Sequence, residues 1–230
     1  MKVVILCGGY GTRLSEETAV KPKPMVKIGK KPILEHIMSI YEHYGYNQFI
    51  LALGYKSEYI KKFYKNKKNI SLVYTGKDTK TGGRILRLKN YLKNEKTFML
   101  TYGDGVANIN IKKAIRFHKN HGKIATITAV RPPLRFGELK ISRKKVKSFK
   151  EKPQVGQGWI NGGFFVFNKE VLNFIKNDQT MLEREPLEKL TRVGQLMAYE
   201  HRGFWKCMDT MRDKILLNQL WNKGNALWKK

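Results

Sequence analysis

Residues 2–25 read KVVILCGGYGTRLSEETAVKPKPM, and the rest of the chain is organised around this stretch. It begins with a short apolar run that is rich in β-branched residues and ends in glycines, which predicts a buried strand entering a tight turn. Glycines let the backbone approach a ligand closely and point several N–H groups at one anion. Arg13 and Lys23 add positive charge beside that anion. The stretch therefore predicts a loop that holds a nucleoside triphosphate.

Two other phosphate-binding loops do not fit this stretch. A P-loop requires G-x-x-x-x-G-K-[ST], and the chain contains no such run. A dinucleotide-binding loop requires G-x-G-x-x-G, but residues 9–14 read GYGTRL, with leucine at the last position and an arginine where that loop carries no charge. The glycines alone fit an ordinary strand–helix turn equally well. Arg13 and the Lys-Pro-Lys-Pro run at 21–24 favour anion binding instead.

Composition limits the classes of protein. A chain of 230 residues with 41% hydrophobic residues can form one α/β domain with a sizeable core, and disorder is not expected. No apolar run approaches the roughly 20 residues of a membrane span. Cys7 and Cys207 lie far apart and lack a metal-ligand spacing. We therefore expect a cytoplasmic, reduced protein that spans no membrane.

The formal net charge of +28 is the unusual feature of the composition. A basic surface can serve a nucleic acid or an anionic membrane. It can equally arise from lysines that cover solvated faces. No zinc finger, helix-turn-helix or aromatic RNA-binding motif accompanies the charge. We therefore favour solvated lysines over a nucleic-acid partner, and note that a basic surface also steers anionic substrates.

Strand-like and helix-like segments alternate along the chain. Strands are expected at 3–7, 48–53, 69–74, 97–102 and 124–130, with helices between Pro32 and Gly45 and at 58–64, 84–91 and 111–120. This alternation predicts an α/β fold with a doubly wound, mostly parallel sheet that binds ligands at the carboxyl ends of its strands. Short strands follow at 138–141 and 145–149, a strand at 163–167, helices at 169–176 and 186–192, a strand at 196–200 and a helix at 211–221.

A series of short motifs connects the chain to a known family. They read GGYGTRL at 8–14, KPKPM at 21–25, TGGR at 81–84, YGDG at 102–105, FGEL at 136–139, EKP at 151–153, INGGFF at 160–165 and MDT at 208–210. In this order they resemble the sugar-1-phosphate nucleotidyltransferases, and the similarity runs from the first strand to Trp228. Within that family the chain is most similar to members that use CTP and glucose 1-phosphate.

The resemblance implies a Rossmann-like nucleotidyltransferase fold in a single domain, residues 1–230. Residues 1–130 would mainly bind the nucleotide, 131–210 would form a β-rich region that mainly binds the sugar phosphate, and 211–230 would form a C-terminal helix. The implied reaction is Mg²⁺-dependent transfer from CTP to a hexose 1-phosphate, with glucose 1-phosphate favoured, giving a CDP-sugar and pyrophosphate. The implied partners are CTP, the sugar 1-phosphate and further copies of the chain in a homo-oligomer.

The resemblance also assigns roles to individual residues. The catalytic cations would be Arg13, Lys23 and Lys152. The nucleotide would contact Leu6, Gly8, Gly9, Gly11, Thr12, Arg13, Lys23, Thr81, Gly82, Arg84, Gly103 and Asp104. The sugar phosphate would contact Tyr102, Gly137, Glu151, Lys152, Asn161, Gly162 and Trp205. Asp104 and Asp209 would hold the Mg²⁺ ion, in keeping with the preference of Mg²⁺ for one or two carboxylates plus phosphate oxygens.

Each of these assignments has a purely structural alternative. Asp104 lies between two glycines and can be a turn former, and Asp209 precedes a predicted helix and can be its N-cap. Thr81 can likewise be the N-cap of the helix that Arg84 enters. If Arg84 instead reads the base, its donors suit cytosine, because cytosine presents adjacent acceptors at O2 and N3 whereas uracil and thymine carry a donor at N3.

Three other functions stay open. The same reaction could use UTP or dTTP. A non-catalytic nucleotide-sugar sensor is a second alternative, although the intact Arg13, Lys23, Asp104 and Asp209 speak against it. A basic nucleic-acid-binding protein is the third. The chain also departs from the family, since it lacks about two dozen residues between the Gly-Tyr-Lys turn at 54–56 and the third strand. That departure affects the expected oligomer contacts and some nucleotide contacts.

Overall fold

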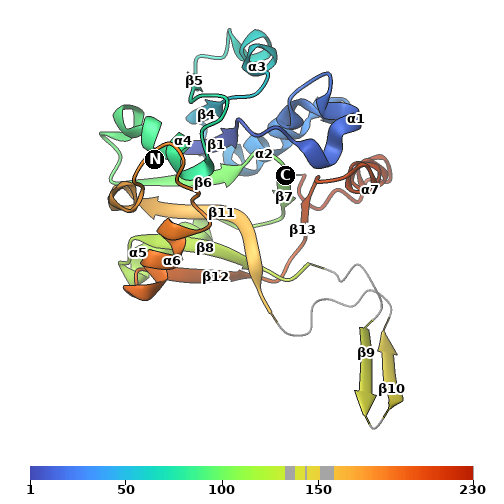
Figure 1. The fold of residues 1–230 in the computed structure, drawn as a ribbon. Coiled ribbons are helices and arrows are strands. Elements are labelled where there is room, and N and C mark those ends of the chain that lie inside the picture. The colour runs from blue at the N-terminus through green and yellow to red at the C-terminus, as the bar shows by residue number, and fades with distance from the viewer. Residues whose placement is uncertain (133–137, 143, 151–157, 230) are drawn as a thin grey trace.

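The computed structural model describes residues 1–132, 138–142, 144–150 and 158–229. Its centre is a seven-stranded sheet in the order β12–β8–β11–β6–β1–β4–β5 (Figure 1). The strands are β1 (Val3–Cys7), β4 (Phe49–Leu53), β5 (Ile70–Tyr74), β6 (Thr97–Tyr102), β8 (Ala125–Val130), β11 (Ile160–Asn168) and β12 (Leu196–His201). β11 is antiparallel to β6 and β8, and the other neighbouring pairs are parallel. The expected α/β fold with a mostly parallel sheet is confirmed.

Helices cover both faces of the sheet. The helices are α1 (Ser15–Thr18), α2 (Ile33–Glu42), α3 (Ser57–Tyr64), α4 (Thr81–Arg87), α5 (Ile111–His121), α6 (Glu185–Arg192) and α7 (Met211–Asn222). Apolar residues of α2, α3, α5 and α7 share one core cluster with Val3, Ile5 and Cys7 of β1. Apolar residues of α4 and α6 share a second cluster with Val4 and Leu6. Because both faces of β1 are buried, its sequence is a continuous apolar run.

Short elements complete the chain. The 3-10 turns are η1 (Thr12–Leu14), η2 (Lys23–Met25), η3 (Lys89–Leu92) and η4 (Lys169–Phe174). Three two-stranded ladders lie outside the main sheet: β2 (Lys27–Ile28) with β3 (Lys31–Pro32), β7 (Gly105–Ala107) with β13 (Trp205–Cys207), and β9 (Glu138–Ser142) with β10 (Lys145–Lys150). The β7–β13 pair brings the segment before α7 next to the carboxyl end of β6. The expected strands at 138–141 and 145–149 are confirmed as the antiparallel β9–β10 ladder.

The helix expected at 211–221 is confirmed as α7, but the two alternative N-caps, Thr81 and Asp209, and one expected helix are wrong. The helix expected at 84–91 is α4, which begins at Thr81 and ends at Arg87, and its N-cap is Lys80. The Thr81 hydroxyl donates to Glu183 instead of capping the helix. The N-cap of α7 is Thr210, which forms a reciprocal capping box with Asp213, so Asp209 is not the cap. The expected helix at 169–176 is the 3-10 turn η4. The division of the domain into nucleotide and sugar parts stays a prediction.

The C-terminal segment is anchored by an aromatic cluster. Trp228 is fully buried, and its ring stacks on Phe204 with 5.4 Å between centroids. Its Nε1–H donates to Nδ1 of His36 at 3.4 Å, and Nε2 of His36 lies 2.9 Å from the carbonyl oxygen of Ile28. The neutral imidazole satisfies both contacts when Nε2 carries the hydrogen. His36 is therefore a core residue that ties the C-terminus to α2.

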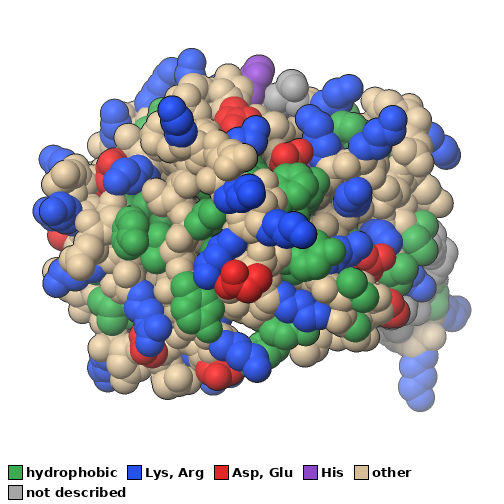
Figure 2. Space-filling model, turned by 90° about the horizontal axis from the view of Figure 1, so that it is seen from above, with side chains coloured by type: hydrophobic (Ala, Val, Ile, Leu, Met, Phe, Trp, Pro, Cys, Tyr) green, Lys and Arg blue, Asp and Glu red, His purple; other side chains and the backbone are tan. Residues whose placement is uncertain are grey.

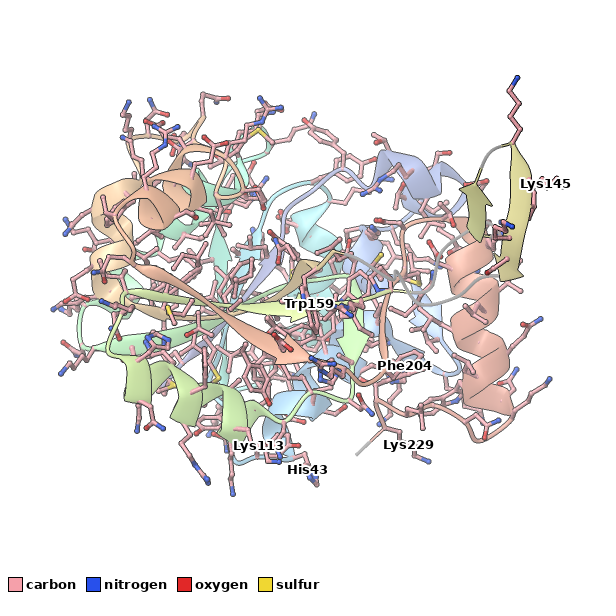
Figure 3. All side chains as sticks on the ribbon, turned by 90° about the horizontal axis from the view of Figure 1, so that it is seen from below. His43, Lys113, Lys145, Trp159, Phe204 and Lys229 are labelled. Carbon is pink, nitrogen blue, oxygen red and sulfur yellow. The ribbon has the colours of Figure 1, made fainter. Side chains whose placement is uncertain are left out.

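On the face that Figure 2 shows, the positive charge is spread rather than gathered in one patch. Figure 2 shows Lys and Arg side chains distributed across one face, with acidic side chains between them. Lys113 on α5 and Lys145 on β10 are exposed and extend away from the body of the protein (Figure 3). In the described part of the chain, no helix has the length and the apolar composition that crossing a membrane requires.

Candidate active site

A cavity of about 430 Å³ opens at the carboxyl ends of β1 and β6, where a doubly wound sheet is expected to bind its ligand. This volume lies within the range of about 300–1,000 Å³ that is typical of small-molecule sites. One wall is the glycine loop after β1, and the facing wall is formed by residues 77–81 at the start of α4. Gly103 and Asp104, which follow β6, close the side between them.

Most of the expected nucleotide contacts line this cavity. Those that do are Leu6, Gly8, Gly9, Gly11, Thr12, Arg13, Lys23, Thr81, Arg84, Gly103 and Asp104. Gly82 does not line it, since an added Cβ there would lie 2.7 Å from the Thr180 carbonyl oxygen in the layer behind the wall. Residues that the sequence interpretation did not assign also line it, namely Cys7, Tyr10, Pro24, Lys77, Asp78, Thr79, Lys80 and Met181. Residues 77–80 belong to the polar, glycine-rich segment that precedes Arg84, and the sequence interpretation assigned no role to them individually.

Four charged side chains meet at the end of the cavity next to β6. The ammonium Nζ of Lys23 lies 2.6 Å from Oδ2 of Asp104 and 2.6 Å from Oδ1 of Asp209. Nη1 of Arg13 lies 2.9 Å from Oδ2 of Asp209. Arg13 and Lys23 come from the glycine loop and η2, Asp104 follows β6, and Asp209 follows β13. The structure therefore brings together residues that lie up to 196 positions apart in the chain.

The charges of this quartet stabilise one another. Burial disfavours the ammonium of Lys23, but the two carboxylates outweigh this effect and raise the pKa of Lys23 above its ordinary value. Burial also disfavours the carboxylate of Asp209, but Lys23 and Arg13 outweigh it and hold the pKa of Asp209 below its ordinary value. Lys23 is therefore a fixed cation and Asp209 a fixed anion at neutral pH.

Glycine is required at two positions of the loop, for different reasons. Gly11 has φ of +67°, in the left-handed region that favours glycine, and it turns the chain into η1. Gly8 is needed because of a neighbour: a Cβ at this position would lie 2.1 Å from Nη1 of Arg84. The backbone at Gly8 is therefore packed directly against the guanidinium of Arg84.

Both terminal nitrogens of Arg84 are bonded to the protein. Its side chain is buried, with 4% of the residue exposed. Nη1 donates to the Leu53 carbonyl at 3.1 Å, the Gly76 carbonyl at 2.7 Å and Thr75 Oγ1 at 2.9 Å, and Nη2 donates to the Gly8 carbonyl at 2.9 Å and the Lys77 carbonyl at 3.2 Å. The two terminal nitrogens carry four hydrogens, so none is left for the adjacent acceptors of a base. The terminal nitrogens join three chain segments, so a bidentate contact with cytosine through them does not fit this geometry. The assignment of Arg84 to the nucleotide stays a prediction.

The expected sugar-phosphate residues form a second group. Tyr102 lines the cavity, and its hydroxyl accepts a hydrogen bond from Nδ2 of Asn161 at 3.3 Å. Nε1–H of Trp205 donates to the Gly162 carbonyl at 2.7 Å, so the segment after β12 is tied to β11. The remaining expected residues of this group, Gly137, Glu151 and Lys152, lie outside the described residues.

Glu183 joins the two groups and was missed from the sequence. Its Oε1 accepts from the Tyr102 hydroxyl at 2.6 Å, and its Oε2 accepts from the Thr81 hydroxyl at 2.6 Å. Burial, with the Glu183 carboxylate as a further cause, raises the pKa of Tyr102, so Tyr102 is a neutral donor at all physiological pH values. Glu183 stands between η4 and α6 in a stretch without a motif, and no sequence signal points to it.

The carboxylate pair suits a hard cation. No cluster of three or more His, Cys, Asp or Glu residues that could hold a metal occurs among the residues described. Asp104 and Asp209 nevertheless share a single cationic group, the ammonium of Lys23, with a carboxylate oxygen from each in direct contact. Two carboxylates beside a triphosphate site are the donors that Mg²⁺ ordinarily takes from a protein, with the rest supplied by phosphate and water. The residues present therefore fit a Mg²⁺ ion.

The chain belongs to the nucleotidyl transferase family, because the model of that family matches residues 2–212. The glucose-1-phosphate cytidylyltransferase of Salmonella typhimurium (strain LT2) is 51% identical to it, over all of this chain and 99% of the relative. The probable glucose-1-phosphate cytidylyltransferase of Bacillus subtilis (strain 168) is 45% identical over the same shares. Among solved structures, HddC from Yersinia pseudotuberculosis superposes with a TM-score of 0.77 at 28% identity, covering 96% of this chain and 99% of that chain.

The same comparison bears on the missing segment. The alignment with the Salmonella protein spans 254 positions, whereas this chain has 230 residues. This excess agrees in size with the segment of about two dozen residues that is expected to be missing at a surface connection. In the structure, residues 65–69 alone connect α3 to β5, so the connection at the expected place is short.

Proposed function

We propose that this protein transfers the cytidylyl group of CTP to glucose 1-phosphate, giving CDP-glucose and pyrophosphate. The observation that carries the proposal is the 51% identity, over the full length of both chains, to a glucose-1-phosphate cytidylyltransferase. The cavity with its charged quartet supports it, since a triphosphate needs cations on one side and a metal site on the other.

The chemistry requires no general base. The second pKa of a phosphate monoester is about 6, so the sugar phosphate is mostly dianionic at neutral pH and is already a nucleophile. The barrier is the approach of this anion to the anionic α-phosphate. Arg13 and Lys23 would neutralise the triphosphate, and Lys152, which lies outside the described residues, would neutralise the sugar phosphate. These cations would also hold the attacking oxygen in line with the α-phosphate.

Asp104 and Asp209 would hold a Mg²⁺ ion. When bound, that ion supplies positive charge to the phosphate oxygens, where negative charge accumulates during the transfer. Tyr102 and Asn161 would face the sugar, since both carry groups that donate and accept hydrogen bonds with a diol. Glu183 holds Tyr102 and Thr81 in place, so it couples the wall of the nucleotide site to the sugar site.

Pyrophosphate release tests the proposal. The purified protein is incubated with Mg²⁺, one of CTP, UTP, dTTP or GTP, and one of three hexose 1-phosphates with glucose, galactose or mannose as the sugar. CTP with glucose 1-phosphate should give the highest rate, and chelation of the metal by EDTA should abolish it. A higher rate with UTP or dTTP would show that this nucleotide, and not CTP, is the preferred substrate. The absence of pyrophosphate release with every pair of substrates would contradict an enzymatic role.

We further propose that the protein acts in the cytoplasm and as a homo-oligomer. The two cysteines support the first point, because both are free thiols and Cys7 is buried in the core. Light scattering coupled to size-exclusion chromatography tests the second point, with a single monomer peak as the contradicting result.

A further inference from the structure

Lys23 occupies the most enclosed place in the charged quartet. Its side chain is 11% exposed and that of Asp209 is 12% exposed, whereas the side chain of Arg13 is 70% exposed. The ammonium contacts one oxygen of Asp104 and one of Asp209 at equal distances of 2.6 Å. An ion that bridged these carboxylates would need the space that the ammonium fills.

The quartet is electrically balanced without any ligand. Two carboxylates face one ammonium and one guanidinium, so the group carries no net charge. A divalent cation that arrives alone must expel a buried ammonium that has no other acidic partner among the described side chains. A cation that arrives on a triphosphate brings anionic oxygens, which give Lys23 and Arg13 new partners and release the carboxylates.

We infer that Lys23 is the resting counter-ion of the Asp104–Asp209 pair, so that a divalent cation binds weakly until a nucleoside triphosphate draws the ammonium away. This inference rests on the proposed function for the identity of the triphosphate. It makes metal and nucleotide binding mutually dependent: each raises the affinity for the other, and by linkage the two factors are equal. It also lowers the occupancy of the site by metal until the substrate is present.

Binding of Mn²⁺ to the nucleotide-free protein tests the inference. Free Mn²⁺ is measured by its electron paramagnetic resonance signal during titration of the wild type and of Lys23→Met. Without its ammonium the carboxylate pair is unneutralised on one side, so Lys23→Met should bind Mn²⁺ at least about tenfold more tightly than the wild type, which is a usual size for such couplings. Lys23→Gln, which has no charge but keeps a donor for one carboxylate, should fall between them.

Two further variants make the result specific. Lys21→Met removes a lysine of the same segment that pairs with Glu17 at 2.8 Å, and it should bind Mn²⁺ as the wild type does. Adding Asp209→Asn to Lys23→Met should abolish the gained affinity. Equal Mn²⁺ affinities of the wild type, Lys23→Met and Lys23→Gln would overturn the inference, and so would a gain that survives Asp209→Asn.

A nucleotide arm separates this inference from the proposed function. Water-proton relaxation reports Mn²⁺ that is bound to the protein, and CTP should raise this signal for the wild type far above that of the Mn²⁺–CTP complex alone. If CTP fails to do so while Lys23→Met gains Mn²⁺ affinity, the role of Lys23 stands and the proposed substrate is contradicted. If neither effect occurs, the role of Lys23 is contradicted as well.

Discussion

Replacing Arg84 with alanine should lower the free energy of unfolding of the protein and leave its preference for CTP over UTP unchanged. The substitution removes a buried guanidinium and leaves the carbonyls of Gly8, Leu53, Gly76 and Lys77 without that donor. A hydrogen bond that involves a charged group is worth about 1.5–3 kcal/mol, and values within one network are not additive. Because water can reach the acceptors on the cavity side, we expect a loss of about 3–5 kcal/mol in the free energy of unfolding.

The assay is urea denaturation followed by circular dichroism, together with the CTP/UTP ratio of kcat/KM. A loss of this size corresponds to a fall in Tm of roughly 6–20 °C for a chain of this length. Arg87→Ala is the matched control, because Arg87 lies on the same helix, is 44% exposed and pairs with Asp178 at the surface. That control should lose less than about 1 kcal/mol. The CTP/UTP ratio of Arg84→Ala should stay within about twofold of the wild type, well below the tenfold that 1.4 kcal/mol represents.

Gly8→Ala provides an independent test of the same contact. Its Cβ would lie 2.1 Å from Nη1 of Arg84, so the guanidinium must move and lose part of its network. The two variants should therefore lose stability in the same direction, and Arg84→Lys should recover only part, since an ammonium is a point donor. A stable Arg84→Ala protein that no longer prefers CTP would refute this reasoning. Arg84 would then be assigned to the recognition of cytosine.

Three further outcomes are expected. Asp209→Asn should lower turnover at least about a hundredfold, which is about 2.7 kcal/mol in the transition state, and near-normal turnover would remove Asp209 from the metal site. Lys152→Ala should raise the KM for the sugar phosphate more than that for CTP, and Arg13→Ala should do the reverse, so equal defects in both substrates would contradict this division. Burial lowers the pKa of His36, so the unfolded chain takes up the proton first as the pH falls. The stability measured by urea denaturation should therefore decline below the unfolded pKa of about 6.5, and His36→Gln should show a smaller decline.

Much of the fold follows from local sequence. The apolar run of β1 and the glycines after it predict a buried strand and a loop at its carboxyl end, because burial on both faces and a positive φ at Gly11 select those residue types. The alternation of strands and helices predicts the doubly wound sheet, since parallel strands need crossover connections. The capping box of Thr210 and Asp213 is also a local signal, and it is the reason that Asp209 is left free of the helix start.

Only the tertiary structure decides which chemistry each polar side chain performs. Arg84 looks like a base reader in its motif, yet its acceptors come from three separate loops that only the folded sheet brings together. Lys23 reaches Asp104 and Asp209 because β6 and the β7–β13 pair end beside the glycine loop. Glu183 carries no sequence signal and still joins Thr81 to Tyr102. A sequence determines the donors and acceptors that a side chain offers, whereas the partners it finds depend on distances that exist only after the chain has folded.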